Sequence, residues 1–542
     1  MAKSRERKIK LIPLGGLGEV GKNMTVVEYG NDMILIDVGL TFPDESMLGV
    51  DIVIPDFSYI VENKEKLRGV FLTHGHEDHI GAVPYLLKQV DTNIYCSKLT
   101  KGLLELKFKE HGLNSNHIKQ VNVNNTVKVG DISCEFIRVS HSIPDACAIA
   151  VKTPIGIIIF TGDFKMDFTP IDGEVTDIQR LAELGKKGVL ALFSDSTNVE
   201  REGYSMSEKN VGDTFKSVFS QAKSRIIVAT FASNLHRVQQ VITAAEENNR
   251  KVCLSGRSML NNIKVASELG YLKIGKNTLI DIKDINKYAP EEILVLSTGT
   301  QGEPLSALTR MAKGEHKQVH LNSSDTVILS SSAIPGNEMA IDDVINNLTE
   351  IGVNVIYSKL ADVHVSGHAC QEEIKLMHSL TTPKFFIPGH GEARQLYTHA
   401  KLALDMGMPK ENIIIADNGD VIEITKNSIK KAGRVSAGAT LIDGSGIGDV
   451  GNIVLKDRKH LSEDGLIVVS LTFNPKTQDV VAGPDIVSRG FVYVKESQDI
   501  IEGSKQATLK AIEKCRKEEI YAISQIKYHI RDYIKNYVYA QT

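Results

Sequence analysis

Residues 73–79 constrain this chain more than any other segment. They read Thr-His-Gly-His-Glu-Asp-His, so three imidazoles and the carboxylate of Asp78 fall within six positions. Histidine and aspartate side chains are ligands that suit zinc or a similar divalent cation. The apolar run 69–72 before the segment is typical of a buried strand, and the run 80–83 after it begins a helical pattern. The sequence therefore predicts metal ligands at the point where a strand ends and a helix begins.

A turn of this kind can direct neighbouring side chains toward two different ions. We expect His74 and His76 to face one metal ion, and Asp78 and His79 to face a second. The alternative interpretation is a surface loop that happens to be rich in histidine.

Two further candidate ligands follow predicted strands. His141 comes after the run 136–139, and Asp163 comes after the run 156–160. Strand ends converge in a folded domain even where the chain between them takes a long path. We therefore expect both residues to join the metal site, with Asp163 lending one oxygen to each ion.

Three more polar residues end apolar runs. Asp37 follows Ile34-Leu35-Ile36 and is expected to orient a ligand histidine rather than bind metal directly. Asp195 follows a strand-like run and either caps a helix or supports the site. His390 follows the strand-like run 384–387 and offers a late ligand for the second metal ion.

The glycine-rich stretch 16–23 matches G-x-G-x-x-G and nearly matches a phosphate-binding loop. Both nucleotide motifs need a helix to open at the last glycine, so that its N-terminus meets the phosphates. Residues 24–29 are strand-like instead, and Asn23 stands where the loop needs a hydroxyl residue. We interpret the stretch as a tight turn beneath the metal site.

Two segments that begin predicted helices combine small polar residues with histidine. Free N–H groups at helix starts bind phosphate, although plain capping explains the same residues. We expect the two segments to contact substrate phosphate through Ser233, Asn234, His236, His364, Val365, Ser366, Gly367 and His368.

Composition restricts the class of protein. Of the 542 residues, 42% are hydrophobic and 24% charged, as in ordinary globular proteins, and no apolar run is long enough to span a bilayer. The six cysteines form no C-x-x-C pair, which argues against a thiolate zinc site or a disulfide framework. The net charge of −4 is not typical of proteins that coat nucleic acid, so contacts with a polyanion would have to be local. We expect a cytoplasmic protein without membrane association.

The predicted elements divide the chain into five parts. A β-rich α/β pattern covers 1–205, and regular strand–helix alternation, typical of a parallel sheet, covers 206–369. The β-rich pattern returns over 370–447. A Gly- and Asp-rich linker at 448–464 leads to a small α+β domain at 465–542.

Together these residues resemble the metallo-β-lactamase fold with a β-CASP insertion, and within it the ribonuclease J family. The resemblance covers nearly the whole chain. It implies an α/β fold: an αββα sandwich at 1–205 and 370–447, an inserted β-CASP domain and a C-terminal α+β domain. It rests on Asp37, residues 74–79, His141, Asp163, Asp195, residues 366–368, His390 and the segments 15–23, 230–237 and 483–490.

The resemblance assigns roles by position. It implies one zinc ion held by His74, His76 and His141, and another held by Asp78, His79 and His390, with Asp163 shared; manganese or magnesium are alternatives. The candidates that position the nucleophile or assist the leaving group are Asp78, Asp195, His368 and His390. It also implies a structural calcium ion at Gly49, Asp51 and Asp443.

The family implies a 5′→3′ exoribonuclease that prefers 5′-monophosphate ends, can cut internally and acts on single-stranded RNA in RNA decay and processing. It implies a homodimer or homotetramer, with a paralogous subunit and an RNA-decay complex as partners. Its members usually end in a further basic and apolar strand, which is not found before the last residues 540–542 here.

Three other functions compete with this one. A thioesterase or lactonase on the same fold would not need the long insert or residues 364–368. A non-catalytic scaffold would have lost metal ligands, yet all of the expected ligands are present. A nucleotide-binding protein rests only on the glycine-rich stretch.

Overall fold

The computed structural model describes residues 7–44, 46–303, 306–334, 337–444, 446–490 and 498–541. The chain divides into two compact units. The first comprises Met1–Phe42 and Ile52–Thr440, and the second comprises Pro43–Asp51 and Leu441–Thr542. None of the described helices is long and apolar enough to cross a membrane.

The first unit is built around two sheets that share one core. The first sheet has the order β23-β22-β1-β3-β4-β6-β7-β8, and the second has the order β20-β13-β12-β11-β10-β9. Phe71 of the first sheet and Phe136 of the second are fully buried, with ring centroids 6.2 Å apart. The strands of the first sheet are β1 (Ile9–Gly15), β3 (Met24–Tyr29), β4 (Asp32–Ile36), β6 (Leu67–Phe71), β7 (Ile94–Cys96), β8 (Ile118–Gln120), β22 (Asp420–Ile424) and β23 (Ile429–Arg434). Those of the second are β9 (Thr126–Val129), β10 (Ile132–Arg138), β11 (Cys147–Thr153), β12 (Gly156–Phe160), β13 (Val189–Asp195) and β20 (Phe385–Gly389).

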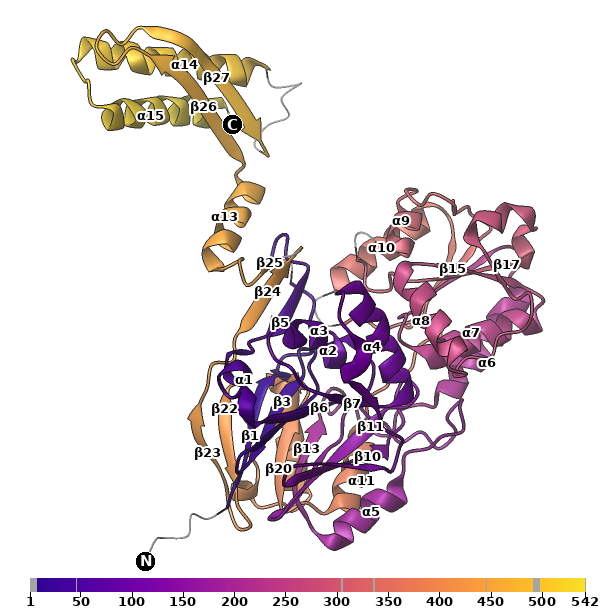
Figure 1. The fold of residues 1–542 in the computed structure, drawn as a ribbon. Coiled ribbons are helices and arrows are strands. Elements are labelled where there is room, and N and C mark those ends of the chain that lie inside the picture. The colour runs from indigo at the N-terminus through magenta and orange to yellow at the C-terminus, as the bar shows by residue number, and fades with distance from the viewer. Residues whose placement is uncertain are drawn as a thin grey trace, which may run out of the picture. The chain divides into compact units, whose positions relative to one another are not determined.

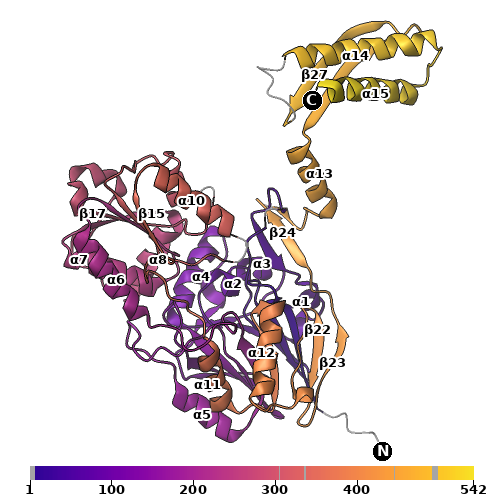
Figure 2. The ribbon, with the colours of Figure 1, turned by 180° about the vertical axis from the view of Figure 1, so that it is seen from behind.

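Helices complete this part of the unit. A second apolar core lies between the outer face of the second sheet and three helices, which Figure 2 shows together: α5 (Ile178–Lys187), α11 (Gln371–Thr381) and α12 (Ala393–Asp405). The helices that connect strands of the first sheet are α1 (Ser58–Glu62), α2 (Glu77–Ile80), α3 (Val83–Leu87) and α4 (Lys98–Glu110).

The residues between β13 and α11 form a separate layered insert, drawn in magenta and pink in Figure 1. Its sheet has the order β16-β15-β17-β14-β18-β19, and the described pairs are all parallel. The parallel sheet expected from the strand–helix alternation is therefore confirmed. Its strands are β14 (Ile226–Ala229), β15 (Lys251–Ser255), β16 (Leu279–Ile280), β17 (Ile293–Ser297), β18 (Thr326–Leu329) and β19 (Asn354–Tyr357). Its helices are α6 (Glu208–Gln221), α7 (Leu235–Glu247), α8 (Arg257–Glu268), α9 (Ala307–Ala312) and α10 (Glu338–Glu350).

The second unit contains a β-hairpin and two long helices. β26 (Leu466–Phe473) pairs with β27 (Val480–Arg489), and α14 (Gln498–Lys517) packs on α15 (Ile523–Gln541). The stretch expected to be a linker contains α13 (Asn452–Glu463), which has no buried residue.

The remaining described strands of the whole chain are short: β2 (Leu17–Gly18), β5 (Ile52–Pro55), β21 (Gly391–Glu392), β24 (Ala439–Asp443) and β25 (Gly446–Ile447).

A buried ion pair joins α6 to α7 inside the insert. Both side chains are almost completely buried, and the guanidinium of Arg237 donates to the two carboxylate oxygens of Glu208 at 2.9 and 3.0 Å. The same guanidinium donates to the Val363 carbonyl at 2.8 Å. The two helices therefore depend on a charge that has no access to water.

Replacing this arginine by methionine (Arg237→Met) should destabilise the insert strongly. The Glu208 carboxylate would stay buried without its partner, which typically costs about 3–5 kcal/mol. The matched control is Lys216→Met, because Lys216 and Glu247 pair at 3.2 Å between the same two helices but are about half exposed. That change should cost about 0–1 kcal/mol. Urea unfolding monitored by hydrogen exchange of α6 and α7 measures both, and equal losses would contradict the argument.

Candidate dinuclear metal site

Four strands of the second sheet, β10, β12, β13 and β20, deliver polar residues to one edge. β12, β13 and β20 are parallel neighbours, and their carboxyl ends lead to Asp163, Asp195 and His390. β11 is antiparallel to both β10 and β12, so β10 runs in the same direction as β12 and leads to His141 at the same edge. The sheet topology therefore gathers residues that lie up to 249 positions apart in the sequence.

The histidine-rich segment reaches this edge from the first sheet. It follows β6, and Asp78 and His79 lie in the first turn of α2, so a helix begins here three residues before residue 80, where the sequence predicted its start. Asp37 follows β4 with a φ of +59°, and His390 has a φ of +46°. Non-glycine residues in this left-handed region are uncommon and often mark functional sites.

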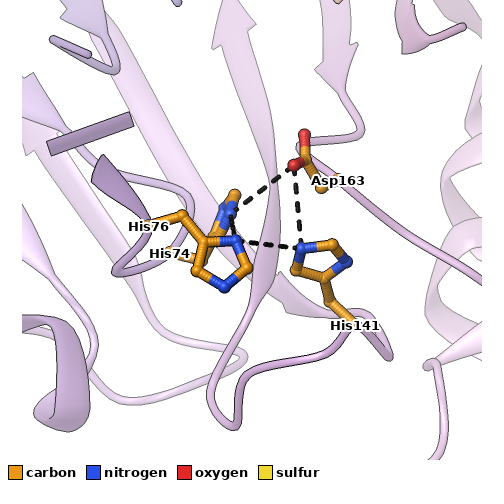
Figure 3. A group of neighbouring side chains, drawn as sticks. All are labelled: His74, His76, His141 and Asp163. Atoms are coloured by element: carbon orange, nitrogen blue, oxygen red, sulfur yellow. Dashed lines mark hydrogen bonds and ion pairs between the residues drawn. The ribbon is translucent and has the colours of Figure 1, made fainter. Parts of the chain in front are cut away.

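The first ligand group consists of His74, His76, His141 and Asp163, and their ligand atoms converge (Figure 3). His76 Nδ1 lies 3.0 Å from His74 Nε2 and 3.2 Å from His141 Nε2. Asp163 Oδ2 lies 3.6 Å from His74 Nε2 and 3.7 Å from His141 Nε2. Four ligand atoms about 2.1 Å from a tetrahedral zinc ion lie about 3.4 Å apart, so the group fits one ion.

The second group consists of Asp78, His79, Asp163 and His390. Asp78 Oδ2 lies 3.4 Å from His79 Nε2 and 3.3 Å from His390 Nε2. The other carboxylate oxygen of Asp163, Oδ1, lies 3.3 Å from His79 Nε2 and 2.8 Å from His390 Nδ1. Asp163 thus presents one oxygen to each group, which is the arrangement that a bridging ligand needs.

Several atoms of the second group have no ordinary partner. Within the described part of the chain, Asp163 Oδ1 and both ring nitrogens of His390 are buried without a well-aligned hydrogen bond. Buried polar atoms are rarely left in this state, because an unmade hydrogen bond is costly. Three residues of this second group, His79, Asp163 and His390, also line a cavity of about 40 Å³. The donor set and these unpaired atoms fit a bound divalent cation.

Neighbouring groups hold two of the imidazoles in a tautomer that can bind metal. The carbonyl oxygen of Gly367 lies 2.7 Å from His141 Nδ1 and can only accept, so Nδ1 carries the proton and Nε2 faces the site. The carboxylate of Asp37 lies 2.8 Å from His79 Nδ1 and acts on that ring in the same way. Asp37 therefore lies behind a ligand histidine and not among the ligand atoms.

The two groups differ in their protonation. Burial, together with the neighbouring imidazoles, lowers the pKa of His74 and His141 well below the usual value and that of His76 to about 4. Burial also opposes protonation of His79 and His390, but nearby carboxylates, chiefly that of Asp163, outweigh it and raise both pKa values well above the usual range.

A third cluster links the site to the segment at residues 364–368. His368 Nδ1 lies 2.8 Å from Asp195 Oδ2, and the ring centroid of His368 is 5.1 Å from that of His141 and 5.5 Å from that of His390. Burial lowers the pKa of His368, but Asp195 and Asp163 raise it above its usual value. The other oxygen of Asp195 accepts from Thr197, so the carboxylate is fixed on both sides.

Only some of the residues predicted to contact phosphate lie at this edge of the sheet. Ser366 Oγ accepts from Asn198 at 2.7 Å, and the side chain of Asn198 also donates to the carbonyl of His368. Asn234 caps α7 by accepting from Arg237 N. The structure places His236 Nε2 3.2 Å from Asp172 Oδ2, so this imidazole is engaged elsewhere.

His364 keeps one nitrogen available. Its Nε2 lies 3.2 Å from Ser332 Oγ, and its buried Nδ1 has no partner among the described residues. Burial and nearby cations lower its pKa to about 3.

Sequence reasoning missed Ser332 and Asn198. The serine run 330–332 directly follows β18, and that position at a strand end was the available signal. Val365 is buried, and Ser233 is partly exposed.

The predicted calcium residues lie near a guanidinium. Arg458 Nη2 is 2.5 Å from Asp443 Oδ2, and its Nη1 donates to the carbonyl of Leu48, next to Gly49. Asp51 Oδ2 accepts from the backbone N–H of Gly444 at 2.7 Å. The calcium site stays a prediction, with Arg458 as the cation found beside Asp443.

Sequence comparison matches four segments to known families. Residues 17–186 match the metallo-beta-lactamase superfamily, and residues 223–348 match the ribonuclease J beta-CASP domain. Residues 352–416 match a Zn-dependent metallo-hydrolase RNA specificity domain, and residues 453–542 match the ribonuclease J C-terminal domain. The fold and the site define a zinc-dependent metallo-hydrolase of the metallo-β-lactamase type that carries a β-CASP insert and acts on RNA.

Full-length relatives specify the family. The chain is 44% identical over 539 residues to "Ribonuclease J 1" of Streptococcus pyogenes serotype M3, covering 99% of this chain and 96% of the relative. It is 40% identical over 543 residues to "Ribonuclease J2" of Bacillus subtilis, covering 100% of this chain and 98% of the relative. The chain belongs to the ribonuclease J family.

One solved structure supports the fold alone. It is titled "Crystal Structure of a Protein of Unknown Function from Enterococcus faecalis V583" and aligns with a TM-score of 0.56 at 18% identity. The alignment covers 77% of this chain and 100% of that one.

The family match makes RNA the substrate class and removes the thioesterase, lactonase and nucleotide-binding alternatives.

Metal binding should release protons from the second ligand group but not from the first. At pH 7 the raised pKa values keep His79 and His390 protonated without metal, so each gives up a proton when it becomes a ligand. His74, His76 and His141 are already neutral. Affinity at the second group should therefore fall as the pH drops through neutrality, whereas the first should hold zinc until the pH nears 4. Calorimetric zinc titrations in buffers of different ionisation enthalpy count these protons, and equal release from both sites would contradict the assignment.

Proposed function

We propose that the protein is a two-zinc 5′→3′ exoribonuclease that prefers 5′-monophosphate ends and can also cut RNA internally. The observation that carries this proposal is the pair of ligand groups that share Asp163 at one sheet edge. A dinuclear centre of this kind suits in-line attack on a phosphodiester, because it can neutralise charge on the attacking side and on the phosphate.

The chain's own residues supply binding, orientation and proton transfer around that centre. Two bound zinc ions would provide a hydroxide-strength nucleophile at neutral pH and charge neutralisation at the phosphate; manganese or magnesium are alternatives. Asp195 accepts from His368 Nδ1, which fixes the imidazole beside both ligand groups. In that place His368 can hold a proton for the departing 3′-oxygen, and Asp195 keeps the ring in position.

A pocket for the terminal phosphate supports the end preference. His364 keeps a buried Nδ1 without a partner among the described residues, and Ser332 contributes a hydroxyl 3.2 Å from the other ring nitrogen. Asn198 holds Ser366 and the carbonyl of His368 in the same segment. A phosphate bound at this segment would present the first phosphodiester bond to the metal-binding edge, because His368 lies next to both regions.

The assembly and the cellular setting stay predictions from the family. We expect a homodimer or homotetramer, with a paralogous subunit and an RNA-decay complex as partners, acting in the cytoplasm. Size measurement by light scattering tests the first of these expectations directly.

The decisive experiment is a time course on RNA labelled at its 5′ end. Zinc- or manganese-loaded protein should release labelled mononucleotide from 5′-monophosphorylated RNA at least about tenfold faster than from 5′-triphosphorylated RNA, because each 1.4 kcal/mol of lost phosphate binding changes a rate tenfold. His76→Ala should abolish release, since it removes a nitrogen from the first ligand group.

The matched control is His320→Ala, because His320 lies in the insert outside all three ligand clusters found among the described residues. Mononucleotide release without an end preference would contradict the phosphate pocket. Internal fragments alone would show an endonuclease instead of the proposed exonuclease.

A further inference from the structure

The glycine-rich stretch 16–23 has no role in the function proposed above. It is not followed by a helix: β3 begins at Met24 and pairs antiparallel with β1. Gly16, Gly18 and Gly21 all have positive φ values, so the chain turns compactly between β1 and β3, with only the two-residue β2 inside the turn. The turn ends at Asn23, whose side chain lines the same small cavity as His79 and Asp163.

Asn23 makes a dense set of contacts with the second ligand group. Its backbone N–H donates to the carbonyl of Asp78 at 3.0 Å, and its own carbonyl accepts from Gly39 N at 2.9 Å. Its side-chain Nδ2 lies 3.1 Å from the Asp78 carbonyl, 3.3 Å from Asp78 Oδ2 and 3.2 Å from His79 Nε2. The residue therefore touches both ligands that α2 supplies.

The orientation of the amide follows from its partners. The backbone carbonyl of Asp78 can only accept a hydrogen bond, so the atom that faces it must be the NH₂ group and not the oxygen. The amide of Asn23 accordingly presents donors to the Asp78 carboxylate. It is a hydrogen-bonding partner of a ligand and not a ligand itself.

Two glycines allow this close approach. A Cβ atom at Gly16 would lie 2.3 Å from Asn23 Oδ1, and a Cβ atom at Gly39 would lie 1.6 Å from the carbonyl oxygen of Asp78. Neither distance is tolerable for real atoms. Glycine in the turn, and in the segment after β4, therefore leaves the room that lets Asn23 and Asp78 lie in contact.

Asp78 is the ligand that most needs such support. Its side chain is 29% exposed, whereas those of His79, His390 and Asp163 are 3%, 7% and 2% exposed. Among the described side chains outside the ligand histidines, Asn23 alone bonds to its carboxylate. Without this donor, the partly exposed carboxylate would keep only its contacts with His79 and His390.

We infer that Asn23 is a positioning residue that holds the Asp78 carboxylate in place for the second metal ion. The inference rests on the proposed two-metal function and deepens it. The glycine-rich stretch then serves the metal site by presenting an amide donor to a carboxylate ligand, which explains why it resembles a phosphate-binding loop without being followed by a helix. Partners of this kind typically contribute about 10- to 100-fold to metal affinity or activity.

The test compares metal binding by the full-length wild-type protein, Asn23→Ala and Asn23→Leu. Leucine has the same branched shape and number of heavy atoms as asparagine but no donor, so it fills the site beside Gly16 if alanine fails to fold. Metal-free protein is titrated with zinc against a fluorescent chelator, and circular dichroism confirms folding. Wild type should bind two ions, and both variants should bind the first ion unchanged and the second about 10- to 100-fold more weakly. Turnover should fall at limiting zinc and recover at excess zinc, with KM for RNA unchanged.

The matched control is Asn418→Ala. Asn418 holds the same glycine-rich turn from its other side, through Leu17 and Glu19, but contacts no metal ligand. If the variants at Asn23 keep the second ion as tightly as this control does, the inference is wrong while the two-metal proposal stands. If wild type itself binds no second ion, the proposed function fails and the role of Asn23 fails with it.

Discussion

The carboxylate of Asp163 is buried between two sets of imidazoles, and the rest of the site is arranged around it. Moving a carboxylate out of water is costly unless charges or hydrogen bonds compensate. Here one oxygen faces His74 and His141, while the other faces His79 and His390. A single buried charge thus links the ends of three strands, β10, β12 and β20, with the segment after β6.

The two ligand groups share this carboxylate but differ in the other carboxylates around them. The first group contains three imidazoles around one carboxylate oxygen, and burial with mutual repulsion keeps those imidazoles neutral. The second group adds the carboxylate of Asp78, and Asp37 bonds to His79 from behind. These carboxylates raise the pKa of His79, so its ring holds a proton where a metal ion would otherwise bind. Without metal, protons on His79 and His390 therefore balance the carboxylates of the second group, whereas the imidazoles of the first group stay uncharged.

Much of the site could be predicted from the sequence because its ligands lie where apolar runs end. The turn at 73–79, His141, Asp163 and His390 all follow strands, and a strand end is a local feature that one sequence displays. The parallel sheet of the insert was predictable for the same reason, since regular strand–helix alternation is also local.

Contacts between distant segments could not be predicted in this way. Asn23 meets Asp78 across 55 positions, and Asn198 meets Ser366 across 168. His236 looked like a phosphate-binding residue, but it pairs with Asp172, a partner that only the folded chain reveals. A Gly- and Asp-rich stretch suggested a linker, yet α13 forms within it. In each case the deciding partner is supplied by tertiary packing, which local pattern does not encode.

The segment that returns from the insert, proposed above to bind phosphate, contacts a candidate metal ligand directly. The carbonyl of Gly367 fixes the tautomer of His141, and a Cβ atom at Gly367 would lie 2.7 Å from that imidazole. One residue further on, His368 Nδ1 bonds to the carboxylate of Asp195, and the side chain of Asn198 donates to the backbone carbonyl of His368. Any displacement of this segment must therefore shift a metal ligand and the Asp195–His368 pair together. If residues 364–368 bind the terminal phosphate, as proposed, the same contacts would transmit that binding to His141 and to the Asp195–His368 pair.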